Sequence, residues 1–207
     1  MDETTVSAYD KDSESISDLH HGLIPYRLYD LVLSYFKRDK KTLDIGCGSG
    51  RDTAWLSSNG FDVLGIDASF GMLDQAKRKH PDLVFEKIKL PGLAEIPDDA
   101  YYNVLCSAVF MHLDYESLGA AANNIVRIMR EGGILLLSFR GTKEKNKREN
   151  GKLYEKISCE DAIMLFCRDR CELLFYESTV EVGRGHVWHT FVFRKLDSLA
   201  VSDAISV

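Results

Sequence analysis

The sequence predicts an α/β fold, with a doubly wound, mostly parallel seven-stranded sheet whose last strand is antiparallel. Short apolar runs alternate with amphipathic segments of helical period, which is the pattern of parallel strands joined by crossover helices. Two of these runs are apolar on both faces, as expected of strands covered on each side. The last two strand-like stretches have no helical pattern between them, so we expect them to form an antiparallel pair.

The elements of the first half follow in order. Apolar residues at helical spacing predict a helix over about 25–36. The strand "KTLDI" leads into the helix "RDTAWLSSNG", which ends at Asn59-Gly60. The strand "FDVLGID" leads into a helix that Ser69 caps and Pro81 stops. The run "LVFEKI" predicts a third, shorter strand.

The second half starts with the apolar run "NVLCSAVF", a buried strand. A long helix follows and is expected to end at Gly132-Gly133, before the buried strand "ILLLSF". The segment "RGTKEKNKRENGK" is interpreted as a charged loop. Ser158 and Asp161 have the spacing of a capping box for the next helix, and "CELLFYEST" and "VWHTFVFRK" are the final two strands.

Three parts of the chain are expected: an acidic, mobile arm over 1–24, a single domain over 25–196 and a frayed tail over 197–207. Six acidic residues lie between Met1 and Asp18 against one basic residue, so the arm supplies most of the net charge of −6. This balance disfavours a general nucleic-acid binder, which normally carries a basic face.

The five cysteines form no CxxC pair and are expected to be free thiols in a reducing compartment. No secretory signal and no apolar run of membrane-spanning length is found, so a cytoplasmic protein is expected. No metal site is predicted, because no histidine lies near the Cys167–Cys171 pair in the sequence.

The glycines after the first strand, Gly46, Gly48 and Gly50, predict a ligand that approaches the backbone closely. Their pattern is G-x-G-x-G, with Arg51 where a dinucleotide-binding loop has its third glycine, and no GK[ST] follows. An NAD-dependent enzyme and a phosphate-binding loop are therefore disfavoured. The glycines alternatively form an ordinary tight turn.

Two carboxylates accompany this loop at the ends of the first two strands. Asp67 is placed to accept hydrogen bonds from both hydroxyls of a ribose, and Asp44 adds a negative charge that would suit a cationic ligand. Each has a purely structural alternative: Asp67 caps the helix that begins near Ser69, and Asp44 is a strand-end residue.

With these features in place, "LDIGCGSG", "VLGIDAS", "YYNVLCSAVFMHL" and "IMREGGILLLSF" resemble the successive motifs of class I S-adenosylmethionine-dependent methyltransferases. The resemblance covers about 42–139 and implies S-adenosyl-L-methionine as the cofactor. It also implies the cofactor-binding residues, which are Asp44, Gly46, Cys47, Gly48, Gly50, Asp67, Ala68, Met72, Leu90 and Ser107. The acidic residue that relatives often have near Ile88, facing adenine, is absent here.

Four residues near the strand ends are candidates for the methyl acceptor. His112 follows the fourth strand and is a candidate general base, or alternatively packs the loop. Arg140, Arg184 and Trp188 are candidate substrate-binding residues. Arg140 would hold an anionic substrate, or alternatively is a solvated arginine, and Trp188 alternatively serves packing. Trp188 and His189 should face opposite sides of their strand. Tyr9 is a candidate for folding over the cofactor.

The leading hypothesis is a methyltransferase that acts on a small molecule, since no appended domain for a macromolecule is seen. The alternatives are a methyltransferase of RNA or protein and a non-catalytic S-adenosylmethionine-binding protein. No membrane partner is expected, and the oligomeric state does not follow from the sequence.

Overall fold

The computed structural model describes residues 1–168 and 170–197 and contains one seven-stranded sheet of order β3-β2-β1-β4-β5-β9-β8. β9 pairs antiparallel with both β5 and β8, whereas β3, β2, β1, β4 and β5 pair parallel. The predicted fold class, with its antiparallel last strand, is confirmed. The strands are β1 (Lys41–Ile45), β2 (Asp62–Asp67), β3 (Phe85–Lys87), β4 (Tyr101–Ser107), β5 (Met129–Arg140), β8 (Cys171–Val180) and β9 (Val187–Lys195).

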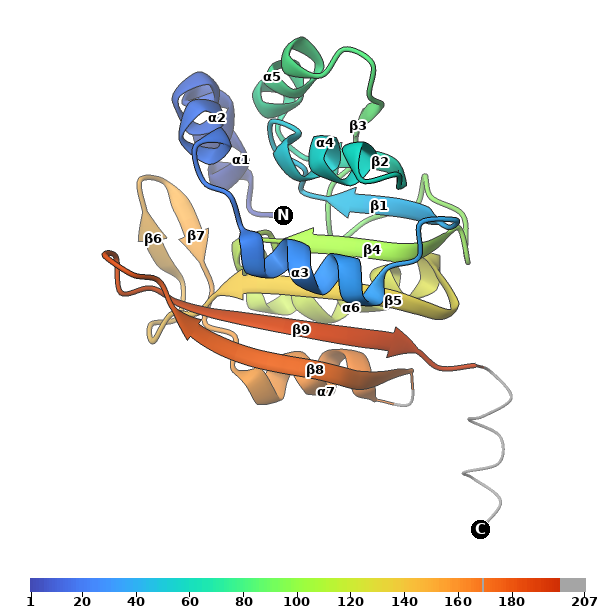
Figure 1. Ribbon diagram of the computed structural model, residues 1–207. Helices are drawn as coiled ribbons and strands as arrows, with labels where there is room; N and C mark the ends of the chain where they lie inside the picture. Colours follow the sequence, from blue (N-terminus) through green and yellow to red (C-terminus); the bar gives the residue numbers. More distant parts are fainter. Residues whose placement is uncertain (169, 198–207) are drawn as a thin grey trace.

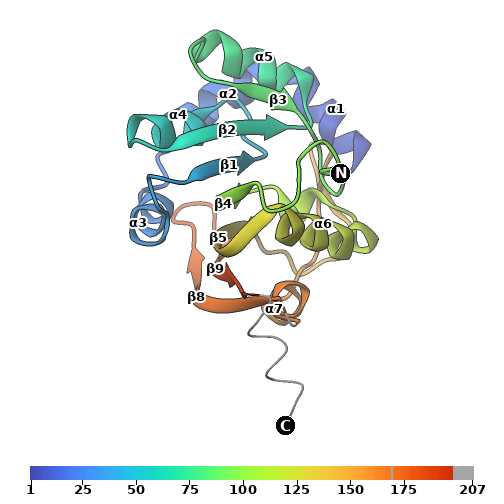
Figure 2. The ribbon, with the colours of Figure 1, turned by 90° about the vertical axis from the view of Figure 1, so that its right-hand side faces the viewer.

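Helices cover both faces of the sheet (Figure 2). α3 (Tyr26–Tyr35) and α4 (Arg51–Ser58) pack on one face, where Ile134 and Leu136 of β5 meet them. α6 (Tyr115–Ile128) and α7 (Cys159–Cys167) pack on the other, against Leu135 and Leu137. This alternation along β5 explains its fully apolar run, because both sides of the strand are buried.

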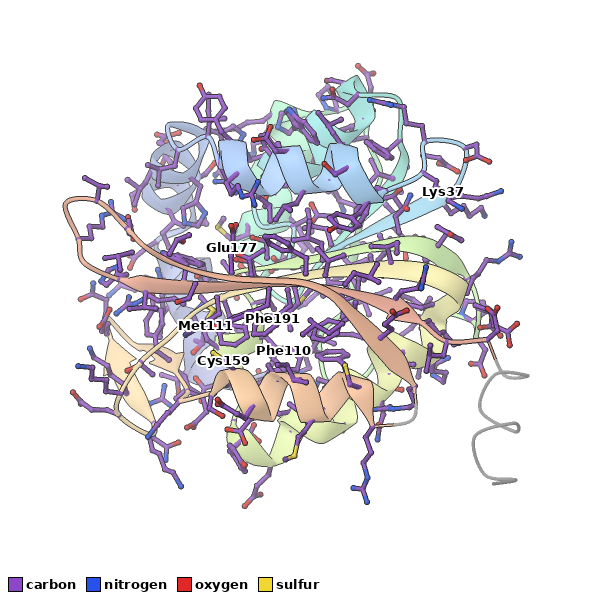
Figure 3. The ribbon with its side chains drawn as sticks, turned by 60° about the horizontal axis from the view of Figure 1, so that its bottom comes forward. Lys37, Phe110, Met111, Cys159, Glu177 and Phe191 are labelled. Carbon is purple, nitrogen blue, oxygen red and sulfur yellow. The ribbon has the colours of Figure 1, made fainter. Side chains whose placement is uncertain are left out.

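The aromatic core lies between the sheet and α7. Phe191 of β9 and Phe110 point toward that helix in Figure 3, and both are fully buried. Phe110 belongs to the short 3₁₀ turn η1 (Phe110–His112), which follows β4. α5 (Phe70–Lys79) packs beside β3 through Leu73, Ala76 and Phe85.

Both predicted helix caps are present. The Ser69 hydroxyl accepts a hydrogen bond from the Met72 amide at the start of α5, and Ser158 forms a reciprocal capping box with Asp161 at the start of α7.

The end of α6 differs from the prediction. The helix stops at Ile128, and Met129 already pairs with Tyr101 as the first residue of β5. Gly132 (φ +70°) lies inside β5 in a bulge, because the next register pair joins Asn103 with Ile134. The two glycines therefore bend a strand and do not end a helix.

The predicted charged loop, 140–152, is in part a β-hairpin, whose strands are β6 (Lys147–Glu149) and β7 (Lys152–Tyr154), the second of which continues past the end of the predicted loop. Asn150 (φ +49°) and Gly151 (φ +80°) form its tight turn, and an Asn-Gly pair is a strong sequence signal for such a turn. The buried guanidinium of Arg140, at the end of β5, fixes the hairpin by donating to both oxygens of Glu149 at 2.7 and 2.6 Å.

The N-terminal arm also differs from an extended tail, since it folds into α1 (Glu3–Lys11) and α2 (Ser13–His21). Its acidic residues find partners on the domain: Asp2 pairs with Arg148, Asp18 with Lys79 and Glu3 with Lys89. The arm's polar composition thus serves docking, and the mobility expected for it stays a prediction. The predicted frayed tail lies outside the described residues from 198 onward. No described helix is long and apolar enough to cross a bilayer.

Gly133 of β5 and Gly119 of α6 differ in the space around them, so alanine substitutions at the two positions test the packing. A Cβ at Gly133 would lie 2.7 Å from the Arg130 carbonyl and 2.9 Å from the Tyr102 carbonyl, whereas Gly119, inside α6, has nothing within 4 Å. We expect Gly133→Ala to lower the free energy of unfolding by about 2 kcal/mol. Gly119→Ala should raise it by about 0.5–1 kcal/mol. Urea unfolding of both variants checks this, and a stable Gly133→Ala would contradict the tight β5 bulge.

The Arg140–Glu149 pair predicts a pH-dependent stability. The Arg140 guanidinium lowers the pKa of Glu149 from 4.5 to about 2. The pair is therefore fully formed above about pH 4.5 and is lost as the pH falls toward 2. We expect Glu149→Gln to have a lower Tm than the wild type at pH 7, with a difference that shrinks between pH 4.5 and 3. The exposed Glu144, changed to Gln, is the control; parallel Tm curves for wild type and Glu149→Gln would contradict the pairing.

Candidate functional site

A cavity of about 660 Å³ lies at the carboxyl ends of β1, β2 and β4. In Figure 1 the arrows of β1 and β4 point toward the side where α1, α2, the β6–β7 hairpin and the β8–β9 turn gather. Residues of all these segments line the cavity. Open parallel sheets bind ligands at this edge, beside the reversal of strand order between β1 and β4.

The glycine loop forms one wall of this cavity. Gly46 (φ +73°) and Gly48 (φ +54°) have left-handed backbone conformations. A Cβ on Gly46 would lie 2.0 Å from a methyl carbon of Val109. The amides of Gly46 and Cys47 both donate to the Ile66 carbonyl, at 2.7 and 3.0 Å. The loop is thus folded tightly against the end of β2, and its residues from Gly46 to Ser49 line the cavity.

Asp67 joins the glycine loop to the start of α5. Its carboxylate accepts from the Gly48 amide and from the Ser69 amide, each at 2.8 Å, and the residue also lines the cavity. Burial raises the pKa of this carboxyl, while the amides of Ser69 and Gly48 lower it. The contact with Ser69 is the structural alternative considered from the sequence. It coexists with exposure toward the cavity, so both roles are open to one carboxylate.

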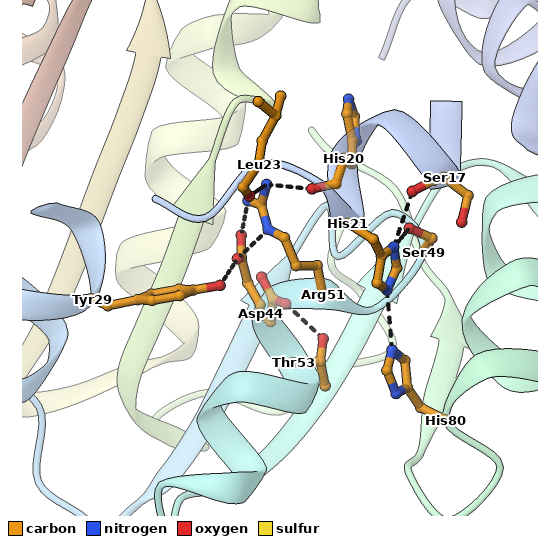
Figure 4. A network of polar contacts seen from close by, with 11 residues as sticks. Ser17, His20, His21, Leu23, Tyr29, Asp44, Ser49, Arg51, Thr53 and His80 are labelled. Atoms are coloured by element: carbon orange, nitrogen blue, oxygen red, sulfur yellow. Dashed lines mark hydrogen bonds and ion pairs between the residues drawn. The ribbon is translucent and has the colours of Figure 1, made fainter. Parts of the chain in front are cut away.

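Eight of the ten predicted cofactor residues line the cavity, and two do not. Those that do are Gly46, Cys47, Gly48, Asp67, Ala68, Met72, Leu90 and Ser107. Asp44 lies behind the wall, 2% exposed, and accepts from the Thr53 hydroxyl at 2.6 Å (Figure 4). Burial, with Asp52 nearby, raises the pKa of Asp44. Gly50 faces Phe85 and His80, which leave no room for a Cβ.

Arg51 attaches the N-terminal arm to this site. Its guanidinium pairs with Asp52 at 2.8 Å and donates to the carbonyls of His20 and Leu23, which lie where the arm passes into α3 (Figure 4). The arm also contacts the start of α5, where Asp10 of α1 accepts hydrogen bonds from the Ser69 hydroxyl and the Gly71 amide at 2.6 and 2.8 Å. The arm therefore closes the cavity over the glycine loop and Asp67.

His112 is held in one tautomer at the cavity wall. Its Nδ1–H donates to the Leu153 carbonyl, so Nε2 of the neutral ring is an acceptor, and the Tyr9 hydroxyl lies 3.2 Å from it. Burial lowers the pKa of His112 to about 4, more than the Leu153 contact raises it. The ring is consequently neutral at pH 7 and presents an unprotonated Nε2 beside the Tyr9 hydroxyl.

Lys152 and Tyr154 also line the cavity, although the sequence did not single them out: Lys152 ends the segment interpreted as a loop, and Tyr154 lies two residues beyond it. The Tyr154 ring packs edge-on to His112 with centroids 5.1 Å apart, and the Arg140 guanidinium lies 4.3 Å from its centroid. Lys152 Nζ lies 4.3 Å from the centroid of the Tyr9 ring. The signal that could have located them is Asn150-Gly151, since residues flanking such a turn belong to strands.

All three predicted substrate residues line the cavity. Arg140 has both terminal nitrogens engaged by Glu149, as described above. Trp188 Nε1 donates to Glu181 at 3.3 Å, and Arg184 lies 3.4 Å from the same carboxylate. His189 faces the opposite side, where its ring packs on Phe139. The predicted opposite orientation of Trp188 and His189 is confirmed.

The site thus combines a backbone cradle, a buried carboxylate and a neutral imidazole in one cavity. Burial raises the pKa values of Asp44 and Asp67, and a positively charged ligand bound close to them would stabilise their ionised forms. In the described part of the chain, no group of three or more potential ligating side chains could hold a metal ion.

Comparison with known proteins finds similarity to methyltransferases. Residues 43–137 match the family model described as "Methyltransferase domain". The chain is 29% identical over 124 residues to a ubiquinone/menaquinone biosynthesis C-methyltransferase of Campylobacter jejuni, covering 56% of this chain and 49% of that protein. It is 32% identical over 142 residues to the glycine N-methyltransferase of Mus musculus, covering 60% and 48%. The chain spans about half the length of these curated relatives.

A solved structure resembles almost the whole fold. The 1,6-didemethyltoxoflavin-N1-methyltransferase of Burkholderia thailandensis, with bound 1,6-didemethyltoxoflavin and S-adenosylhomocysteine, superposes with a TM-score of 0.77 at 17% identity, covering 94% of this chain and 88% of that one. At this identity the likeness concerns the fold. The matched model and the glycine loop show that residues 43–137 form a methyltransferase domain, and the chain is similar to class I S-adenosylmethionine-dependent methyltransferases.

Proposed function

We propose that this protein transfers a methyl group from S-adenosyl-L-methionine to a small molecule, with His112 as the general base. The observation that carries the proposal is that one cavity holds both the Asp67-anchored glycine loop and the basic Nε2 of His112. The first is a cradle for a nucleoside-like ligand, and the second is a base beside it.

The residues present fit the cofactor. Asp67 would hold the ribose, since its two oxygens keep lone pairs beyond the Gly48 and Ser69 contacts. Gly46 and Gly48 would follow the methionine part with backbone groups, and Met72 and Leu90 would contact the adenosine part. Asp44 would act from behind the loop through its charge. When bound, S-adenosylmethionine supplies a methyl group on a sulfonium, and S-adenosylhomocysteine remains after transfer.

The proton chemistry falls to His112 and Tyr9. As the acceptor atom forms its bond to the methyl carbon, it loses a proton, and Nε2 takes that proton directly or through the Tyr9 hydroxyl. The Leu153 carbonyl keeps the ring oriented by accepting from Nδ1–H. The buried ring leaves little room for water to compete, because His112 is 3% exposed.

The enclosure of the cavity favours a small acceptor over RNA or protein. The arm, the β6–β7 hairpin and the β8–β9 turn all contribute to its wall. The neutral, tautomer-fixed His112 in the same cavity as the glycine loop favours a catalytic protein over a non-catalytic cofactor-binding one. The five cysteines are unpaired, which supports our proposal of a reducing, cytoplasmic compartment.

Isothermal titration with S-adenosylhomocysteine tests the cofactor site. We expect micromolar binding, about −8 kcal/mol. Asp67→Asn should weaken it about tenfold or more, because a charged acceptor of hydrogen bonds is lost. Asp62→Asn, at the exposed start of β2, is the matched control and should bind normally. Absence of binding by the wild-type protein, with its Tm unchanged by the ligand, would refute the cofactor assignment.

Labelled-methyl transfer to the acceptor found in a screen tests the base. Removal of a general base costs about 10²–10⁴-fold in rate, so His112→Gln should lose at least about 100-fold in kcat while keeping its affinity for S-adenosylhomocysteine. Tyr9→Phe separates direct from relayed proton transfer, since only a relay requires the hydroxyl. Because the pKa of His112 is about 4, the wild-type rate should stay level from pH 8 to 5.5. A fall centred near pH 6.5 would assign the base to another group.

A further inference from the structure

The positive charges around the cavity are almost all neutralised within the protein. Six lysine and arginine side chains of the described residues line the cavity, and five of them have a carboxylate within ion-pair distance. These pairs are Arg27 with Glu177, Arg51 with Asp52, Lys89 with Glu3, Arg140 with Glu149, and Arg184 with Glu181. The sixth cation, Lys152, is the exception.

Lys152 is half-buried on β7, and no described carboxylate lies within 4.0 Å of its ammonium. Its contact is the face of the Tyr9 ring, 4.3 Å from the ring centroid. Burial lowers the pKa of Lys152, and the more distant Asp12 acts in the opposite direction. A cation–π contact offsets only part of the cost of desolvating an ammonium. The cavity therefore holds one positive charge whose partner the described protein does not supply.

We infer that the methyl acceptor is a small carboxylic acid and that Lys152 binds its carboxylate. This inference rests on the proposed function, since it names the substrate class of the same cavity. Arg140 is the residue that the sequence suggested for binding an anionic substrate, but its guanidinium is already bidentate with Glu149 and stacked on Tyr154. It shapes the wall of the cavity, while Lys152 is free to bind an anion.

The position of Lys152 also limits the length of the acceptor. Tyr9 contacts Lys152 through its ring and His112 through its hydroxyl. One side chain thus separates the carboxylate site from the base. The nucleophilic atom should accordingly lie only a few bonds from the carboxylate, and the aromatic rings of Tyr154 and Trp188 on the same cavity suit a planar compound.

The experiment uses three ortho-substituted benzoates that place an oxygen, nitrogen or sulfur nucleophile beside the carboxylate: salicylate, anthranilate and thiosalicylate. Each is compared with its neutral amide by isothermal titration of the S-adenosylhomocysteine-loaded protein. We expect at least one acid to bind tenfold or more tightly than its amide. Lys152→Met should abolish that difference while leaving the amide's affinity unchanged. Lys152→Arg should keep it, and so should Lys156→Met, an exposed lysine just beyond the hairpin.

Three outcomes would overturn the inference. One is equal binding of acids and amides, or no binding of any acid at millimolar concentration, by protein that binds S-adenosylhomocysteine normally. Another is an acid preference that survives Lys152→Met. The third is a loss of S-adenosylhomocysteine affinity in Lys152→Met, which would assign the lysine to the cofactor's own carboxylate. Failure of wild-type protein to bind S-adenosylhomocysteine is a separate result, which refutes the proposed function itself.

Discussion

The parallel alignment of β1, β2 and β4 is the constraint on which the site depends. Parallel strands bring their carboxyl ends to one edge, so the glycine loop, Asp67 and Ser107 meet there although they are far apart in the sequence. The Asp67 carboxylate then ties this edge together by accepting from amides on two different loops. A ligand held by Asp67 is thereby coupled directly to the conformation of the glycine loop.

The N-terminal arm covers the site through charged groups on both sides of the contact. Asp10 reaches the start of α5, and Arg51 holds the far end of α2 through two backbone carbonyls. The acidic arm thus docks on basic and amide groups around the cavity, which is an electrostatic role for most of the molecule's net negative charge. The same arm places the Tyr9 hydroxyl 3.2 Å from His112 Nε2, so it both forms a wall of the cavity and contacts the proposed base.

Most charged side chains around Tyr154 and Trp188 in the cavity are paired with one another. Arg140 and Glu149 neutralise each other and fix the hairpin, while Glu181 serves both Trp188 and Arg184. Buried charges are normally paired in this way because an isolated ion is costly to desolvate. Lys152 stands out against this background, and that contrast gives its free ammonium more weight than an exposed lysine would have.

The sequence by itself determined the order of the elements and the sheet with its antiparallel last strand, because these follow from local periodicity. The eight predicted cofactor residues that line the cavity came from the resemblance of the strand-end motifs to those of methyltransferases. The Asn150-Gly151 pair is a local turn signal as well, but it stands among charged residues whose composition is typical of a loop. Only the tertiary structure decided that Asp44 and Gly50 lie behind the wall, that the acidic arm is helical and docked, and that Tyr9, His112 and Lys152 share a cavity. The physical reason is separation along the chain: Asp10 and Ser69 are 59 positions apart and Tyr9 and His112 are 103 apart, and local pattern carries no information about such partners.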